Sequence, residues 1–91
     1  MKTAHRIIAN TESASEAMDD AESAVIYRYN NLSTGLAKYM FADCSVLVFR
    51  GCDYFAFDSK DEASIAAYAD WIKTDDEIET AYIRRLLAQA Y

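Results

Sequence analysis

The sequence contains no proline and only two glycines, Gly35 and Gly51, among its 91 residues. Linkers between domains are usually rich in these residues or in serine, and no segment here has that composition. A chain of this length provides material for one domain, and its 53% hydrophobic content is enough for a single modest core. We therefore expect one domain over residues 1–91, with tight connections between regular elements.

Long apolar runs are also lacking. The longest, Val46 to Phe49, is far too short to span a bilayer, and the N-terminus does not show the basic, apolar and small-residue pattern of a signal peptide. Cys44 and Cys52 lie at opposite ends of one predicted strand, about 26 Å apart at about 3.3 Å per residue, whereas a disulfide needs Cα atoms within about 7 Å. We expect two free thiols in a protein of the cytoplasm.

Groups that carry catalysis or hold cofactors are scarce. His5 is the only histidine, and no serine or cysteine is placed by a motif to act as its nucleophile. Two isolated glycines cannot form a phosphate-binding loop, the acid spacings match no calcium loop, and the two cysteines form no paired zinc motif. We expect no enzymatic activity, no metal and no cofactor.

Acidic residues are what the sequence has in excess, with 15 Asp and Glu against 9 Lys and Arg and a net charge of -6. This charge disfavours direct binding to nucleic acid or to an anionic membrane. Between Ile7 and Tyr27 there is no Lys or Arg, but there are five acids, Glu12, Glu16, Asp19, Asp20 and Glu22. Like charges one helical turn apart destabilise a helix by roughly 0.2–0.5 kcal/mol per pair. A function outside the fold is therefore favoured for these acids.

A second acidic run, Asp75, Asp76, Glu77 and Glu79, opens the last helical stretch. The helix dipole accounts for some of these acids, but four within five residues exceed what capping needs. Acids on successive helical turns repeat about every 6 Å, and such a surface can occupy a groove that evolved for DNA phosphates. The alternative is a solvated face that keeps a small protein soluble.

Apolar and small residues recur in steps of three and four from Ala4 to Val25, which predicts one long helix. Alternatively, Ser13 and Glu16 form an internal capping box, and residues 2–8 are a separate strand or turn. A polar cluster over residues 30–35 then predicts a loop.

Residues 36–58 are rich in aromatic and β-branched side chains and are interrupted at residues 42–45 and 50–53, which predicts three antiparallel strands joined by hairpins. Ser59 with Glu62, and Thr74 with Glu77, are expected to cap two final helices. Their predicted apolar faces are Ile65, Tyr68, Ala69 and Ile72, then Ile78, Tyr82, Ile83, Leu86 and Leu87. The expected fold is α+β, with an antiparallel sheet of three or four strands packed by an N-terminal helix and two C-terminal helices.

Particular residues between Gly35 and Leu87 resemble a family of small acidic phage proteins. They are Lys38-Tyr39, Phe41, Asp43, Ser45-Val46-Leu47, Tyr54, Asp58, Ser64-Ile65, Tyr68-Ala69-Asp70-Trp71 and Arg85-Leu86-Leu87. The family comprises anti-CRISPR proteins that act as DNA mimics against type I-F CRISPR-Cas surveillance complexes. The resemblance implies a stoichiometric blocker in the cytoplasm of the host bacterium, whose acids enter a lysine-rich cleft between the large subunit and its neighbour. The acids nearest the family's contact region correspond here to Asp75, Asp76, Glu77 and Glu79.

The leading hypothesis is therefore an anti-CRISPR inhibitor that competes with double-stranded target DNA. Its phosphate surrogates would be Asp75, Asp76, Glu77 and Glu79, together with the pair Asp19 and Asp20. The target is a type I-F complex, another type I subtype or a different DNA-binding machine, and a monomer is favoured. The alternative hypothesis is a non-enzymatic interaction protein, such as an antitoxin that neutralises a basic partner with the same acids.

Overall fold

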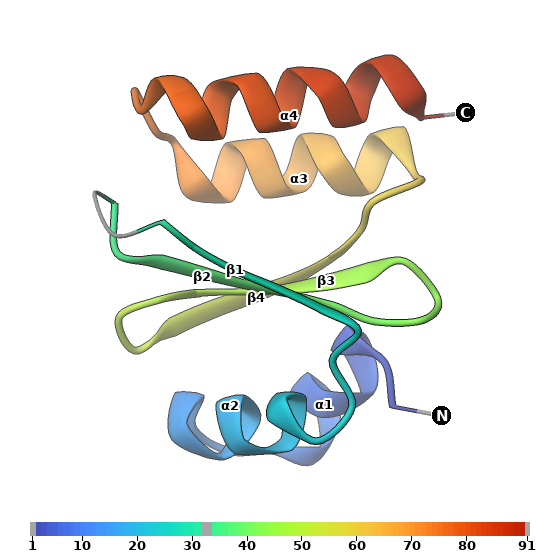
Figure 1. The fold of residues 1–91 in the computed structure, drawn as a ribbon, viewed down its shortest axis with the longest axis vertical. Coiled ribbons are helices and arrows are strands. Elements are labelled where there is room, and N and C mark those ends of the chain that lie inside the picture. Colours follow the sequence, from blue (N-terminus) through green and yellow to red (C-terminus); the bar gives the residue numbers. More distant parts are fainter. Residues whose placement is uncertain (1, 32–33, 91) are drawn as a thin grey trace.

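The computed structural model describes residues 2–31 and 34–90, and it places an antiparallel sheet between two pairs of helices (Figure 1). The elements in chain order are α1 (Ala4–Asn10), α2 (Ala14–Glu22), β1 (Tyr27–Asn31), β2 (Leu36–Met40), β3 (Ser45–Arg50), β4 (Asp53–Asp58), α3 (Glu62–Ile72) and α4 (Glu77–Gln89). The strands form a four-stranded meander in the order β1-β2-β3-β4. This architecture confirms the predicted α+β class, with four strands in the sheet.

The helical region before the sheet is divided. The expectation of one long helix is wrong, because Ser13 starts a new helix: its hydroxyl accepts a hydrogen bond of 3.2 Å from the backbone N–H of Glu16. The Glu16 carboxylate in turn accepts one of 2.8 Å from the N–H of Glu12. The capping alternative was therefore right about Ser13, but the segment before it is the short helix α1 rather than a strand or turn. A capping residue overrode the continuous apolar periodicity.

The position of strand β1 was not predicted. The expected helix ended at Val25 and the expected loop covered residues 30–35, yet Tyr27–Asn31 form a strand that pairs with β2 over its whole length. Tyr27 and Tyr29 alternate with Arg28, which is the period of a strand, while the two asparagines that follow are poor strand formers. Thr34 and Gly35 lie in the expected turn, and Ser33 is outside the described residues.

The three predicted strands and their hairpins are confirmed. At the β3–β4 turn Arg50 faces Asp53, so Gly51 and Cys52 are the two loop residues. Gly51 has φ +62°, and a glycine with positive φ at this position is typical of a type II′ hairpin turn. Both cysteines are free, as expected.

Replacing Gly51 by alanine should therefore lower the free energy of unfolding by roughly 1–2 kcal/mol, because a Cβ at this φ is strained. No atom lies within 4 Å of the position that the Cβ would take, so the cost comes from the backbone alone. Urea unfolding of Gly51→Ala measures this loss. Cys52→Ala, at the neighbouring exposed position, is the control and should unfold like the unmodified protein; equal stability of both variants would contradict the turn assignment.

The sheet carries a core on each face. On one side Tyr39, Phe41, Leu47 and Phe49 pack against α1 and α2. On the other side the buried residues are Leu36, Val46, Val48 and Phe57 of the sheet with Ile65, Tyr68, Ile72 and Leu86 of α3 and α4. Strand β3 is buried on both faces, so its near-continuous apolar run anchors both layers.

The two C-terminal helices begin two residues later than predicted. Asp61 caps α3 and Asp76 caps α4, in place of Ser59 and Thr74. Lys73, in the left-handed conformation with φ +44°, ends α3 and turns the chain toward α4. Only residues 73–76 connect the two helices. None of the helices over the described residues is long and apolar enough to cross a bilayer.

Candidate interaction site

The second acidic run lies at the connection between α3 and α4. The Thr74 hydroxyl accepts a 3.0 Å hydrogen bond from the N–H of Asp76, and the Asp76 carboxylate accepts one of 2.9 Å from the N–H of Glu79. These bonds hold the start of α4, and Asp76 is its capping residue. The Asp76 side chain is partly buried. Asp75 and Glu77, on either side, are exposed, and they make no ion pair with any residue that the structure describes. The connection thus presents two free carboxylates beside a capping one.

Glu79 departs from the sequence-based expectation, because its side chain is 0% exposed. It forms an ion pair with Lys38 of β2, which is itself buried, and it accepts a 3.0 Å hydrogen bond from the hydroxyl of Tyr68. Three residues after the cap, the helix turns this position toward the sheet. A carboxylate without access to solvent cannot reach the basic groove of a partner, so Glu79 belongs to the interior of the fold.

The Lys38–Glu79 pair is enclosed by aromatic rings. The Lys38 ammonium lies 3.7 Å from the centroid of the Tyr82 ring and 5.1 Å from that of Tyr29. Burial lowers the pKa of Lys38 although the Glu79 carboxylate opposes this shift. The pKa values of Tyr68 and Tyr82 are raised, first by burial and then by the negative charge of Glu79. These groups form one buried cluster that joins α4 to the sheet.

The raised pKa of Tyr82 predicts a measurable effect at alkaline pH. Above about pH 10 the tyrosine ionises in the unfolded chain but stays protonated in the fold, so stability falls as pH rises, by up to about 1.4 kcal/mol per pH unit for each such tyrosine. Tyr82→Phe should remove one of these contributions and leave the stability at neutral pH almost unchanged. Urea unfolding at several pH values from 8 to about 11 measures the difference. The lowered pKa of Lys38 makes stability rise with pH, but Lys38 is present in both proteins, so this effect cancels in their difference. Identical slopes of stability against pH for the two proteins would contradict the prediction.

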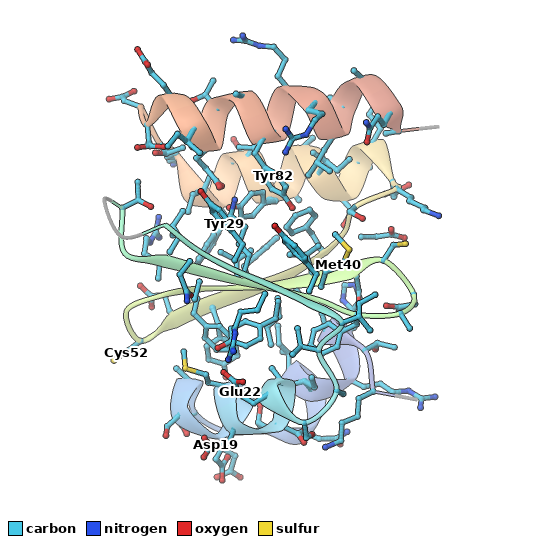
Figure 2. All side chains as sticks on the ribbon, viewed as in Figure 1. Asp19, Glu22, Tyr29, Met40, Cys52 and Tyr82 are labelled. Carbon is cyan, nitrogen blue, oxygen red and sulfur yellow. The ribbon has the colours of Figure 1, made fainter. Side chains whose placement is uncertain are left out.

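The first acidic group lies on α2, and other segments neutralise part of it. Asp20 forms an ion pair with Lys2, whose ammonium also donates a 3.1 Å hydrogen bond to Ser23. Although no Lys or Arg lies between Ile7 and Tyr27, Lys2 therefore compensates the charge of Asp20. Asp19 is exposed and lies on the side of α2 that faces away from the sheet (Figure 2).

Glu22 is compensated in the same way. Its carboxylate lies toward the sheet (Figure 2), where it accepts hydrogen bonds from Arg28, at 2.6 Å, and from the Tyr39 hydroxyl, at 2.9 Å. The Tyr39 hydrogen bond, followed by that of Arg28, lowers the pKa of Glu22. Both cation and phenol come from the sheet, which a search for nearby basic residues along the helix sequence could not reveal.

The structure does not bring the two acidic groups together. Asp19 and Asp20 lie in the α1–α2 layer, whereas the α3–α4 connection belongs to the layer on the opposite face of the sheet (Figure 1). Each group consists of consecutive residues: the first is Asp19 and Asp20, and the second is Asp75, Asp76 and Glu77. A partner that touches both groups must therefore reach across the sheet from one helical layer to the other. Among the described residues, no three His, Cys, Asp or Glu side chains are placed to hold a metal ion.

A groove that the sequence did not predict lies between α4 and the edge formed by β1 and β2. Its volume is about 430 Å³, and its lining residues are Tyr27, Tyr29, Lys38, Met40, Val46, Glu77, Ile78, Ala81, Tyr82 and Arg85. Figure 2 shows Tyr29, Met40 and Tyr82 between the sheet and the C-terminal helices. Ile78 was expected in the buried face of α4, but it is 56% exposed at this groove.

Comparison with known proteins identifies a protein family and a related phage protein. A family model described as anti-CRISPR protein AcrF2 matches residues 4–90. The chain is also similar to anti-CRISPR protein 30 of Pseudomonas phage D3112, with 46% identity over 56 residues. That alignment covers 58% of this chain and 60% of the phage protein, so the chain spans about three fifths of the length of the curated relative that it matches.

Proposed function

Because this chain belongs to the AcrF2 family of anti-CRISPR proteins, we propose that it inhibits a type I CRISPR-Cas surveillance complex by occupying the basic groove that binds target DNA. Within type I, the resemblance favours subtype I-F. The proposed inhibitor acts stoichiometrically, without catalysis, in the cytoplasm of the host bacterium. Family membership favours this function over an antitoxin.

The exposed carboxylates of Asp75 and Glu77 carry the proposal. They flank a capped helix start whose hydrogen bonds hold the backbone, so little backbone conformational entropy is lost when they bind. The positive end of the α4 dipole offsets part of their mutual repulsion, which lets the fold hold negative charges close together, as along a DNA backbone. Lysines that grip phosphates can pair with such carboxylates and release bound counterions in the same way.

Asp76 contributes charge from its capping position, and we propose Asp19 and Asp20 as a second contact. The molecule measures 30 × 29 × 20 Å, which is comparable to one turn of duplex DNA, about 34 Å. Acids in both helical layers suit a cleft whose walls close on two sides of the molecule, such as one between a large subunit and its neighbour. We leave Glu79 out of the contact set because it is buried.

A gel-shift competition tests the proposal. Purified protein is added to type I-F and type I-C surveillance complexes before labelled target duplex, at low and at raised salt. We expect the type I-F complex to lose DNA binding, and raised salt to relieve the inhibition because the contacts are ionic. Loss of DNA binding by the type I-C complex alone would reassign the subtype. Undisturbed DNA binding by both complexes would overturn the proposed target.

A further inference from the structure

Exposed apolar side chains gather at the groove between α4 and the β1–β2 edge. Two of the large hydrophobic residues with the highest exposure, Tyr27 (60%) and Ile78 (56%), line the groove from opposite walls. Single exposed hydrophobics are normal on a protein surface, but two that share one concave, largely apolar site indicate a binding surface. DNA mimicry by carboxylates does not account for this apolar surface, because a DNA backbone presents phosphates and sugars to its partner and no aliphatic side chains.

The charges of the groove limit what can occupy it. At the floor, Lys38 is paired with Glu79 and covered by the Tyr82 ring. At the rim, exposed Glu77 and Arg85 stand eight residues apart on α4, which is about 12 Å along the axis. A matching occupant is apolar in the middle, with a cation at the Glu77 end and no cation at the Arg85 end.

We propose that this groove receives an apolar side chain from a protein subunit of the CRISPR-Cas complex, and that a lysine or arginine beside that side chain pairs with Glu77. The inference rests on the proposed function, and it names a protein contact that DNA mimicry alone does not supply. Glu77 belongs both to the acidic connection and to the groove lining, so the two surfaces are continuous. The acids would speed association, and the apolar anchor would slow dissociation.

Binding measured as a function of salt separates the two contributions. Surveillance complex is immobilised, and affinity is determined at salt concentrations between about 50 and 200 mM, the range over which ionic contacts weaken steeply. Ile78→Ser removes apolar surface from the groove, and Ala81→Trp fills it from the exposed side of α4. Leu87→Ser, at an α4 position that is 40% exposed and does not line this groove, is the matched control. Thermal unfolding verifies that each variant is folded.

We expect Ile78→Ser and Ala81→Trp to weaken binding about tenfold at every salt concentration, with the slope of log affinity against log salt unchanged. Leu87→Ser should bind like the unmodified protein. Unchanged affinity of both groove variants, with normal binding by the unmodified chain, would overturn the groove assignment alone. Absence of binding by the unmodified chain to any type I complex would instead overturn the proposed function and this partner with it.

Discussion

Glu79→Ala should lower the free energy of unfolding by about 3–5 kcal/mol, the usual cost of removing one member of a buried ion pair. The variant leaves the Lys38 ammonium, on a residue that is 6% exposed, without its anion, and it leaves the buried Tyr68 hydroxyl without its acceptor. Native domains are stable by only about 5–15 kcal/mol. A large part of the folded-state stability would therefore disappear, which urea unfolding at neutral pH measures directly.

The double variant Lys38→Met with Glu79→Leu is the matched control. It removes both charges and fills the space with apolar groups, a replacement that often preserves or raises stability. We expect it to recover most of the stability that Glu79→Ala loses, although the Tyr68 hydroxyl still lacks an acceptor. A loss below about 1 kcal/mol in Glu79→Ala, the size of an exposed ion pair, would show that this cluster does not hold α4 on the sheet.

Burial of Glu79 also shows where sequence reasoning reached its limit. Four acids within five residues were treated as one surface, but a helix turns about 100° per residue, and the position of the cap decides which acid faces inward. The cap was placed at Thr74, whereas Asp76 is the capping residue. The buried lysine partner comes from β2, and nothing in the local pattern of either segment links the two.

The sheet was more predictable than the surface that surrounds it. Strands between residues 36 and 58 follow from aromatic and β-branched residues with clear turn signals, and these are local properties. Strand β1 was missed because its polar end resembles a loop. Its own residues have little preference for a strand at that end, and pairing with β2 stabilises the strand instead. The groove combines α4 with this unpredicted strand, so it could not be foreseen. Compensation of Asp20 and Glu22 likewise depends on cations from other segments.

The burial and capping of individual acids decide how the proposed function should be tested by charge reversal. Changing Asp75 and Glu77 to lysine alters two exposed side chains that form no ion pair among the described residues, so the fold should persist. Asp76 must keep its hydrogen bond to the N–H of Glu79, and for that reason Asp76→Ser is used there, since serine caps as well as aspartate. Reversing Asp76 itself would mix loss of binding with loss of the cap.

The variant Asp75→Lys with Glu77→Lys should bind the surveillance complex more weakly by about 2–5 kcal/mol, roughly 30- to 5,000-fold, because each new lysine faces the cations that the carboxylates had paired with. Inhibition in the gel-shift competition should be lost at protein concentrations where the unmodified chain is fully active. Asp76→Ser should cause a smaller loss of affinity. It should also reduce the slope of log affinity against log salt by about one.

A second double charge reversal tests whether the net charge or the position of the acids determines binding. Asp53→Lys with Glu62→Lys changes the net charge from -6 to -2, as the first pair does, at exposed acids outside the proposed contact set. If the α3–α4 connection is the contact, this control should retain nearly all its affinity apart from a modest reduction in association rate. Equal loss in both double variants would mean that the complex responds to overall charge. Full inhibition by the Asp75 and Glu77 variant would remove the connection from the proposed interface and leave Asp19 and Asp20 on α2 as the acids to reverse next.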